Sequence, residues 1–97
     1  MNKKILIFTA TYNEAENIRK FIEKILKLNI KLDLLIIDDN SPDNTWKIVN
    51  EYTKENENII LVKRESKEGL DTAHKLAFNY AKDHNYDYLI TLDADLS

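Results

Sequence analysis

Runs of consecutive apolar residues alternate along the chain with segments in which apolar residues recur every three or four positions. The apolar runs cover positions 5–8, 34–37, 59–62 and 88–92. Continuous runs of this length are typical of strands buried on both faces of a parallel sheet, whereas the longer spacing is typical of amphipathic helices. The pattern predicts the order β-α-β-α-β-α-β and a three-layer, Rossmann-like α/β fold. In this fold helices cover both faces of a parallel sheet, and we expect the sheet of this chain to be truncated after its fourth strand.

Residues with capping propensity mark where the predicted helices begin. Thr11 or Asn13 can cap the first helix, and Asp71 is the expected cap of the third. The second helix is expected to turn its larger apolar residues toward the core, namely Trp46, Val49 and Tyr52.

The composition is that of a small globular domain. The 97 residues are enough for one domain, which we expect to span positions 1–97. The net charge of −3 argues against a nucleic-acid partner, and the absence of cysteine excludes disulfides and thiolate chemistry. No apolar run approaches the ~18–20 residues of a membrane span, and we expect no signal peptide before Ile5. We expect a cytoplasmic protein, or one at the cytoplasmic face of a membrane in a longer parent.

Polar residues gather directly after three of the four predicted strands. These clusters cover positions 9–14, 38–43 and 93–97. The carboxyl ends of parallel strands meet at one edge of a sheet, and ligands of open α/β sheets bind outside that edge. We therefore expect the three clusters to form one site.

Asp93 and Asp95 form an Asp-x-Asp pair just after the last apolar run. Two neighbouring carboxylates repel each other and raise each other's pKa unless a cation relieves them. A hard divalent ion such as Mg²⁺ or Mn²⁺, shared with substrate phosphates, would do so. Asp95 is the better candidate ligand, while Asp93 is expected to contact ribose or to support the metal ligands. The alternative is a pair of solvated carboxylates in a terminal turn.

Asp38 and Asp39 end the second predicted strand. A carboxylate at this position can accept hydrogen bonds from a ribose or a base edge. The alternative is an Asx-turn that starts the following loop, and we expect that role for one of the two residues. Asp39 is the residue expected to face the ligand.

Other candidate ligand contacts follow the first and third strands. Tyr12 could stack on a base, and Glu14 could accept a hydrogen bond from base or ribose or complement the dipole of the following helix. Arg64 and Lys67 could reach phosphates, the arginine through forked hydrogen bonds, or could be solvated loop cations.

The chain carries four motifs whose order and spacing match a known family. They are Thr11–Ile18, Ile36–Thr45, Lys67–Leu70 with Thr72–His74, and Asp93–Ser97. In these motifs the chain resembles the family 2 glycosyltransferases, and most of all the dolichol-phosphate (polyprenol-phosphate) mannosyltransferases. The resemblance extends over the whole chain.

The resemblance implies a GT-A fold, a nucleotide-diphospho-sugar donor of the GDP-mannose or UDP-glucose type, and a Mg²⁺ or Mn²⁺ ion. It implies nucleotide-sugar contacts at Ala10, Tyr12, Glu14, Ile37, Asp39, Arg64, Lys67, Asp93, Ala94 and Asp95. It also implies metal ligation by Asp95, with Asp93 and Ser97 at further ligand positions. A lipid phosphate is the implied acceptor in a full-length parent, and no catalytic residue is implied within this chain.

The chain departs from the family pattern in three ways. Ala10 replaces the usual proline, which reduces rigidity without removing the contact. Asp71 replaces the usual glycine and adds negative charge near the expected phosphates. The family also continues well beyond Asp-x-Asp, with strands that bind the acceptor and position the sugar.

We therefore expect the donor-nucleotide half of a hexosyltransferase, without turnover by itself and prone to self-association through exposed sheet edges. One alternative is a phosphoacceptor domain of the flavodoxin-like kind, which also uses an acidic pair, another aspartate and Mg²⁺. In that class the acidic pair follows the first strand, whereas Asp38 and Asp39 follow the second. The other alternative is a nucleotide-binding module without catalysis.

Overall fold

The computed structural model describes residues 3–65 and 68–94, which form a parallel sheet with helices on both faces. The elements are β1 (Ile5–Thr11), α1 (Ala15–Lys27), β2 (Asp33–Asp38), α2 (Thr45–Glu55), β3 (Ile59–Lys63), α3 (Leu70–Asp83) and β4 (Tyr88–Thr91). The strands lie in the order β3-β2-β1-β4, and every neighbouring pair is parallel. The predicted alternation of strands and helices and the Rossmann-like class are confirmed.

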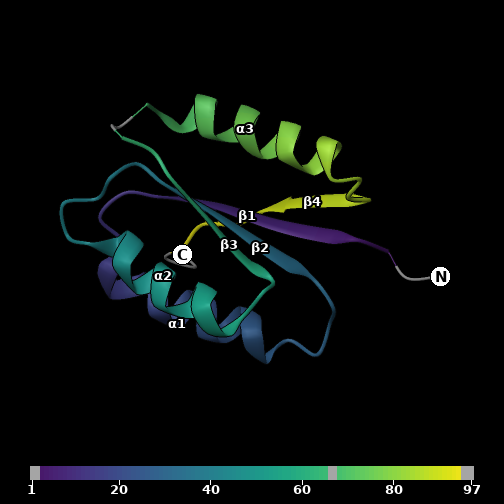
Figure 1. Cartoon of the computed structure of the whole chain (residues 1–97), viewed down its shortest axis with the longest axis horizontal. Coiled ribbons are helices and arrows are strands. Elements are labelled where there is room, and N and C mark those ends of the chain that lie inside the picture. The colour runs from purple at the N-terminus through teal and green to yellow at the C-terminus, as the bar shows by residue number, and fades with distance from the viewer. Residues whose placement is uncertain (1–2, 66–67, 95–97) are drawn as a thin grey trace.

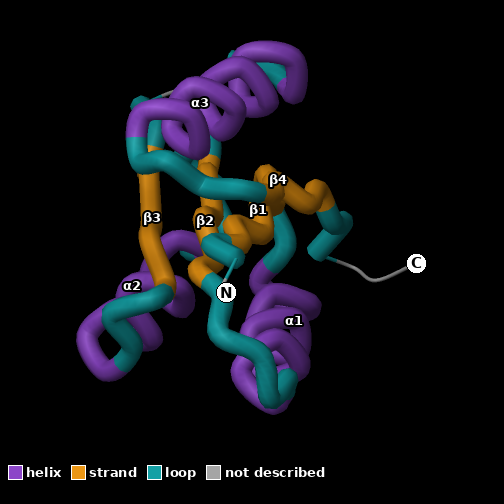
Figure 2. Tube along the Cα trace, turned by 90° about the vertical axis from the view of Figure 1, so that its right-hand side faces the viewer, coloured by secondary structure: helices purple, strands orange, loops and turns teal. Residues whose placement is uncertain are grey.

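The three helices divide the structure into layers. α3 covers one face of the sheet, and α1 and α2 lie side by side on the other (Figure 1, Figure 2). Successive strand residues point to opposite faces, so each strand contributes to both cores. In β1, Leu6 and Phe8 pack under α3, whereas Ile7 packs against α1 and α2. All three side chains are buried, which confirms that β1 is covered on both faces.

β4 differs from the buried strand that its apolar sequence predicts. Tyr88 is 53% exposed and Ile90 is 43% exposed. Leu89 points to the other face and packs against the core under α3. Among the strands of residues 3–65 and 68–94, β4 lies at the edge of the sheet and pairs with β1, and its α3 face packs against a helix. The expectation of a buried fourth strand was wrong because apolar runs do not reveal which strand lies at an edge.

Trp46 also lies elsewhere than predicted. It is half-buried at the start of α2 and belongs to neither apolar core, whereas Val49 is fully buried and Tyr52 packs at the margin. The ammonium of Lys63 lies 3.9 Å from the centroid of the Trp46 ring. The indole therefore covers the end of β3 through a cation–π contact instead of filling the core.

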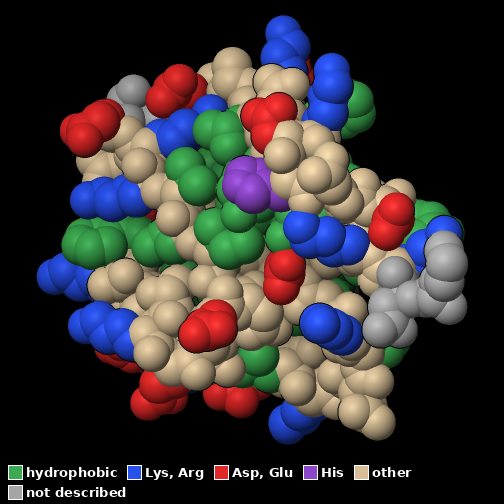
Figure 3. All heavy atoms as spheres, turned by 45° about the vertical axis from the view of Figure 1, so that its right-hand side comes forward, with side chains coloured by type: hydrophobic (Ala, Val, Ile, Leu, Met, Phe, Trp, Pro, Cys, Tyr) green, Lys and Arg blue, Asp and Glu red, His purple; other side chains and the backbone are tan. Residues whose placement is uncertain are grey.

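A membrane-spanning helix must be both long and apolar. None of the helices in residues 3–65 and 68–94 combines the length and apolar character needed to cross a bilayer. On the face shown in Figure 3, acidic and basic side chains are interspersed around a small group of hydrophobic side chains and a histidine.

Candidate functional site

The order of the strands brings the predicted clusters to one edge of the sheet. β1 lies between β2 and β4, so the segments that follow these three strands start next to one another. A hollow of about 140 Å³ opens at this edge. It is lined by Ala10, Thr11, Tyr12, Asp39, Gly69 and Leu70. The lining thus combines the ends of β1 and β2 with the start of α3.

The loop after β2 holds the loop after β1 in place. Three consecutive backbone amides, at the end of the first loop and the start of α1, donate to side chains in the second loop and at the start of α2, each at a distance of 3.0 Å. The pairs are Asn13 N with Ser41 Oγ, Glu14 N with Thr45 Oγ1, and Ala15 N with Asp43 Oδ2. These contacts satisfy amides at the start of α1 that have no partner inside the helix.

The predicted capping of α1 was therefore wrong. Asn13 has a left-handed backbone conformation with φ of 59°, and the helix begins at Ala15 after Glu14, which makes no side-chain cap. The hydroxyl of Thr11 donates instead to Asp38. Likewise Asp71 lies inside the first turn of α3, after Gly69 at the cap position. Local sequence signals misplaced the cap of α1 because the amides at its start find partners 28–31 positions away.

Asp38 is the acidic residue that starts the loop, as expected for one of the pair. It is fully buried and accepts hydrogen bonds from Thr11 Oγ1 at 2.6 Å, Ser41 Oγ at 2.6 Å and Ser41 N at 2.9 Å. The Ser41 hydroxyl therefore donates to Asp38 while it accepts from the Asn13 amide. The carboxylate oxygens of Asp38 accept hydrogen bonds from other groups of the protein, so Asp38 has a structural role.

Asp43 is held as a carboxylate by the same network. Burial opposes its ionisation, but hydrogen bonds from the Thr45 hydroxyl and from the backbone amides of Ala15 and Thr45 prevail. The pKa of Asp43 is consequently lowered below its ordinary value of 3.8. The anion also lies at the positive end of α1, where a negative charge is stabilising.

Asp39 is paired with Arg64, 25 positions later in the chain. Arg64 Nε lies 2.5 Å from Asp39 Oδ1, and Arg64 Nη2 lies 2.9 Å from Asp39 Oδ2. Both residues are only 8% exposed. The same guanidinium donates to the Gly69 carbonyl at 3.1 Å and to Thr72 Oγ1 at 2.8 Å. Asp39, the carboxylate predicted to face the ligand, thus lines the hollow and is also one partner of a buried ion pair.

The structure separates the predicted contact residues into groups. Ala10, Tyr12 and Asp39 line the hollow, and Tyr12 is 39% exposed. Glu14 accepts a hydrogen bond from Asn17 Nδ2 at the start of α1 and is outside the lining. Asp93 is exposed beyond the end of β4.

Two predicted contacts have their side chains in the cores. Ile37 is fully buried under α3, and Ala94 is packed in the core on the opposite face. A ligand at the hollow could meet Ile37 only through its backbone. Lys67, Asp95 and Ser97 lie outside the described residues.

Of the three predicted metal ligands, Asp93 lies within the described residues. Asp93 offers the hard carboxylate oxygen that Mg²⁺ and Mn²⁺ prefer. No group of three or more His, Cys, Asp or Glu side chains is placed for a metal within residues 3–65 and 68–94. The described part therefore holds one fitting donor, and the remaining predicted donors are the two residues beyond it.

Sequence reasoning missed some of the lining. Gly69 has a φ of 95°, a conformation that favours glycine, and this turn lets α3 begin at the edge of the hollow with Leu70 beside it. It also missed the clamp formed by Ser41, Asp43 and Thr45. The available signal was that three short side chains with acceptor oxygens, Ser41, Asp43 and Thr45, stand at every second position soon after Asp38.

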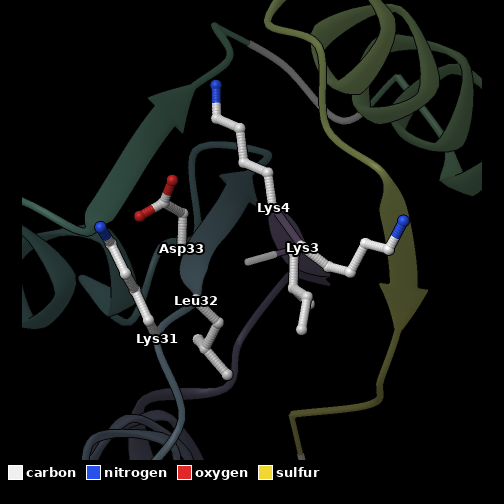
Figure 4. Close-up of a pocket in the computed structure, with 6 residues that line it drawn as sticks. Lys3, Lys4, Lys31, Leu32 and Asp33 are labelled. Atoms are coloured by element: carbon white, nitrogen blue, oxygen red, sulfur yellow. The ribbon is translucent and has the colours of Figure 1, made fainter. Parts of the chain in front are cut away.

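A second hollow, of about 290 Å³, lies at the opposite edge of the sheet. Figure 4 shows Lys3, Lys4, Lys31, Leu32 and Asp33 around it, at the amino ends of β1 and β2. None of these residues belongs to the predicted clusters, so this hollow is not the candidate site.

Comparison with known proteins agrees with the sequence motifs. The model of the family described as "Glycosyl transferase family 2" matches residues 6–97. The undecaprenyl-phosphate mannosyltransferase of Micrococcus luteus is 29% identical over 92 residues, which are 95% of this chain and 38% of that protein. The chain thus spans little more than a third of the length of this relative.

Solved structures show the same fold. A mannosyltransferase of Pyrobaculum calidifontis, solved in complex with GDP-Man and Mn²⁺, matches with a TM-score of 0.82 at 20% identity, over 98% of this chain and 28% of that one. TarS of S. aureus, solved in complex with UDP-GlcNAc, matches with a TM-score of 0.82 at 22% identity, over 95% of this chain and 26% of that one. These likenesses establish the GT-A fold, and the match over residues 6–97 establishes that the chain belongs to glycosyl transferase family 2.

Proposed function

We propose that the chain forms the donor-binding part of a hexosyltransferase. The sugar, such as mannose or glucose, would pass from a GDP- or UDP-sugar to an acceptor such as a polyprenyl phosphate. The observation that carries this proposal is the hollow at the carboxyl edge, where Tyr12 after β1 and Asp39 after β2 lie side by side in a family 2 chain. An aromatic ring and an acceptor carboxylate are the groups that recognise a nucleoside.

The donor and acceptor classes are supported by the similar proteins. One relative is named as an undecaprenyl-phosphate mannosyltransferase, and two structures of the same fold hold GDP-Man with Mn²⁺ and UDP-GlcNAc. The family match and the position of Asp38 and Asp39 after β2 also favour this function over a phosphoacceptor domain. A longer parent would act in the cytoplasm or at the cytoplasmic face of a membrane.

Each residue of the site would have a defined task. Tyr12 would stack on the base, and Asp39 would accept a hydrogen bond from the base or ribose. Asp95, with Asp93 and Ser97, would hold Mg²⁺ or Mn²⁺, which supplies positive charge to the leaving nucleoside diphosphate. A lipid phosphate is already anionic, so its attack on the anomeric carbon needs little help from a general base.

Calorimetric titration tests this function. GDP, UDP and their sugar conjugates would be added to the folded chain with and without Mn²⁺, beside Asp95→Ala and the exposed control Glu57→Ala. We expect metal-dependent binding that Asp95→Ala abolishes and Glu57→Ala retains. Absence of binding by the folded wild type would overturn the proposal.

A second assay addresses turnover. The purified 97-residue chain, given a nucleotide sugar and a polyprenyl phosphate, is expected to transfer no sugar, because the family's acceptor-binding strands follow Asp-x-Asp. Detectable transfer would show that the donor part is catalytic by itself.

A further inference from the structure

We propose that Arg64 is a positioning residue for the nucleoside part of the ligand and does not bind its phosphates. In this arrangement the guanidinium aligns the carboxylate of Asp39 and fixes the segment that closes the hollow. The inference rests on the proposed function and extends it to a residue that the motifs suggested for a different task.

The hydrogen bonds of Arg64 leave little of its guanidinium for a ligand. A guanidinium has about five N–H donors. The structure engages them in four contacts, two with Asp39 and one each with the Gly69 carbonyl and Thr72 Oγ1. One N–H, on Nη1, is left over among the contacts of the described residues. The side chain is also buried, so a diphosphate that used Nε and Nη2 would have to break the pair. Breaking a buried pair leaves an uncompensated charge, which is strongly unfavourable.

The same contacts determine what Asp39 can offer. Its oxygens accept two hydrogen bonds from Arg64 and a third from the Glu68 amide at 3.1 Å. A carboxylate has about four acceptor positions, so the contacts of residues 3–65 and 68–94 leave about one. Asp39 also lines the hollow. It can therefore accept one hydrogen bond from an N–H or O–H group of a nucleoside.

Arg64 also joins three separate segments at this edge. Its backbone amide donates to the Asp38 carbonyl at the end of β2, and its side chain holds Gly69 at the start of α3. The hydroxyl of Thr72 accepts from Arg64 and lies 3.0 Å from the Glu68 carbonyl. Gly69 and Leu70 form one wall of the hollow, so that wall depends on a guanidinium that lies behind it.

The two roles predict different losses of affinity. A phosphate-binding Arg64 would contribute to binding of GDP or UDP but not of guanosine or uridine. A positioning Arg64 would contribute equally to the nucleoside and to its diphosphate, because both need Asp39 and the wall formed by Gly69.

Affinities for guanosine, GDP, uridine and UDP would be measured by NMR titration of the full chain. The proteins are wild type, Arg64→Lys, Arg64→Gln, Asp39→Asn and the exposed control Lys63→Gln. We expect Arg64→Lys to weaken the preferred nucleoside and its diphosphate by the same factor, about tenfold for the lost forked contact. Lys63→Gln should leave nucleoside affinity unchanged. A loss confined to the diphosphate would overturn the proposal.

A measurement on the wild type covers the case in which the variants do not fold. The Arg64 Nε–H proton should exchange slowly with solvent and shift equally with nucleoside and diphosphate. A shift with the diphosphate alone would assign Arg64 to the phosphates and overturn the proposal.

If the wild type binds none of the nucleosides or diphosphates, the proposed function is rejected. The positioning role of Arg64 can still be tested in that case. Hydrogen exchange of the Glu68 amide, which donates to Asp39, should then be about tenfold faster in Arg64→Lys and unchanged in Lys63→Gln. Unchanged exchange in Arg64→Lys would overturn the positioning role.

Discussion

The carboxylate of Asp43 accepts a hydrogen bond from the backbone amide of Ala15, the first residue of α1. The distance from Ala15 N to Asp43 Oδ2 is 3.0 Å. Asp43 lies in the loop after β2, whereas Ala15 follows the loop after the adjacent strand β1. Asp43 also accepts from the amide and hydroxyl of Thr45 at the first residue of α2. One side chain thus joins the starts of both helices on this face of the sheet and fixes the loop that carries Tyr12.

Replacing Asp43 by alanine is expected to lower the free energy of unfolding by about 1 kcal/mol, the usual loss when a helix N-terminal cap is removed. Urea denaturation measures the change. Glu57→Ala removes a carboxylate from an exposed position with no side-chain partner among the contacts of the described residues, and should change stability little. Equal stability of Asp43→Ala and wild type would show that water replaces the clamp without loss.

The contribution of Asp43 should depend on pH. Its folded-state pKa is lowered below the ordinary 3.8, so the stability it provides is complete above that value and is lost as the pH falls through the lower, folded pKa. The difference in stability between wild type and Asp43→Asn should therefore shrink from about pH 6 to about pH 3. A difference that grows on acidification would contradict the hydrogen-bonded carboxylate.

Tyr86→Phe should remove a contact between the turn before β4 and the start of β2. The Tyr86 hydroxyl donates to Asp33 Oδ2 at 2.6 Å. We expect a loss of about 1 kcal/mol at neutral pH, measured by urea denaturation. The exposed control Tyr88→Phe should cost less. Equal losses in both variants would mean that the hydrogen bond adds nothing to stability.

Tyr86 should also affect stability in alkali. Burial, the hydrogen bond to Asp33 and the charge of Asp33 raise the pKa of Tyr86 above the ordinary 10.0. The stability that depends on the protonated phenol is present below pH 10.0 and declines as the pH rises beyond it. Wild type should therefore lose its advantage over Tyr86→Phe in alkali, as thermal unfolding at increasing pH can show.

β4 is expected to promote self-association through its exposed edge and its uncovered apolar side chains. Ile90→Lys places a charge on this surface and should shift the sedimentation-derived mass toward the monomer at high concentration. Ile30→Lys, at another exposed position outside the strands, is the matched control. A wild-type mass of one chain at every concentration would reject this prediction.

Several features of the site could be predicted because they depend on neighbouring positions. Apolar runs and helical spacing predict the elements, and each polar cluster directly follows a strand in the sequence. The role of Asp38 at the start of a loop also follows from such local chemistry, because its acceptor oxygens reach Ser41, three positions away.

The predictions that failed concern partners far apart in the sequence. The caps of α1 come from the loop after β2 instead of from Thr11 or Asn13. The buried pair of Arg64 with Asp39, 25 positions earlier, was likewise not among the predictions. Charge and side-chain type identify a guanidinium or a carboxylate as a hydrogen-bonding group. They do not say which partner will be within reach.

The sequence by itself determined the succession of strands and helices, the parallel sheet and the family, since these follow from spacing over a few residues and from short motifs. Only the tertiary structure decided that β1 lies between β2 and β4, so that the segments following these strands start next to one another. It also decided that β4 has an uncovered face and that Arg64 lies behind the hollow. The physical reason is that hydrophobic periodicity acts on neighbouring positions, whereas strand order and the pairing of buried charges depend on how distant segments pack.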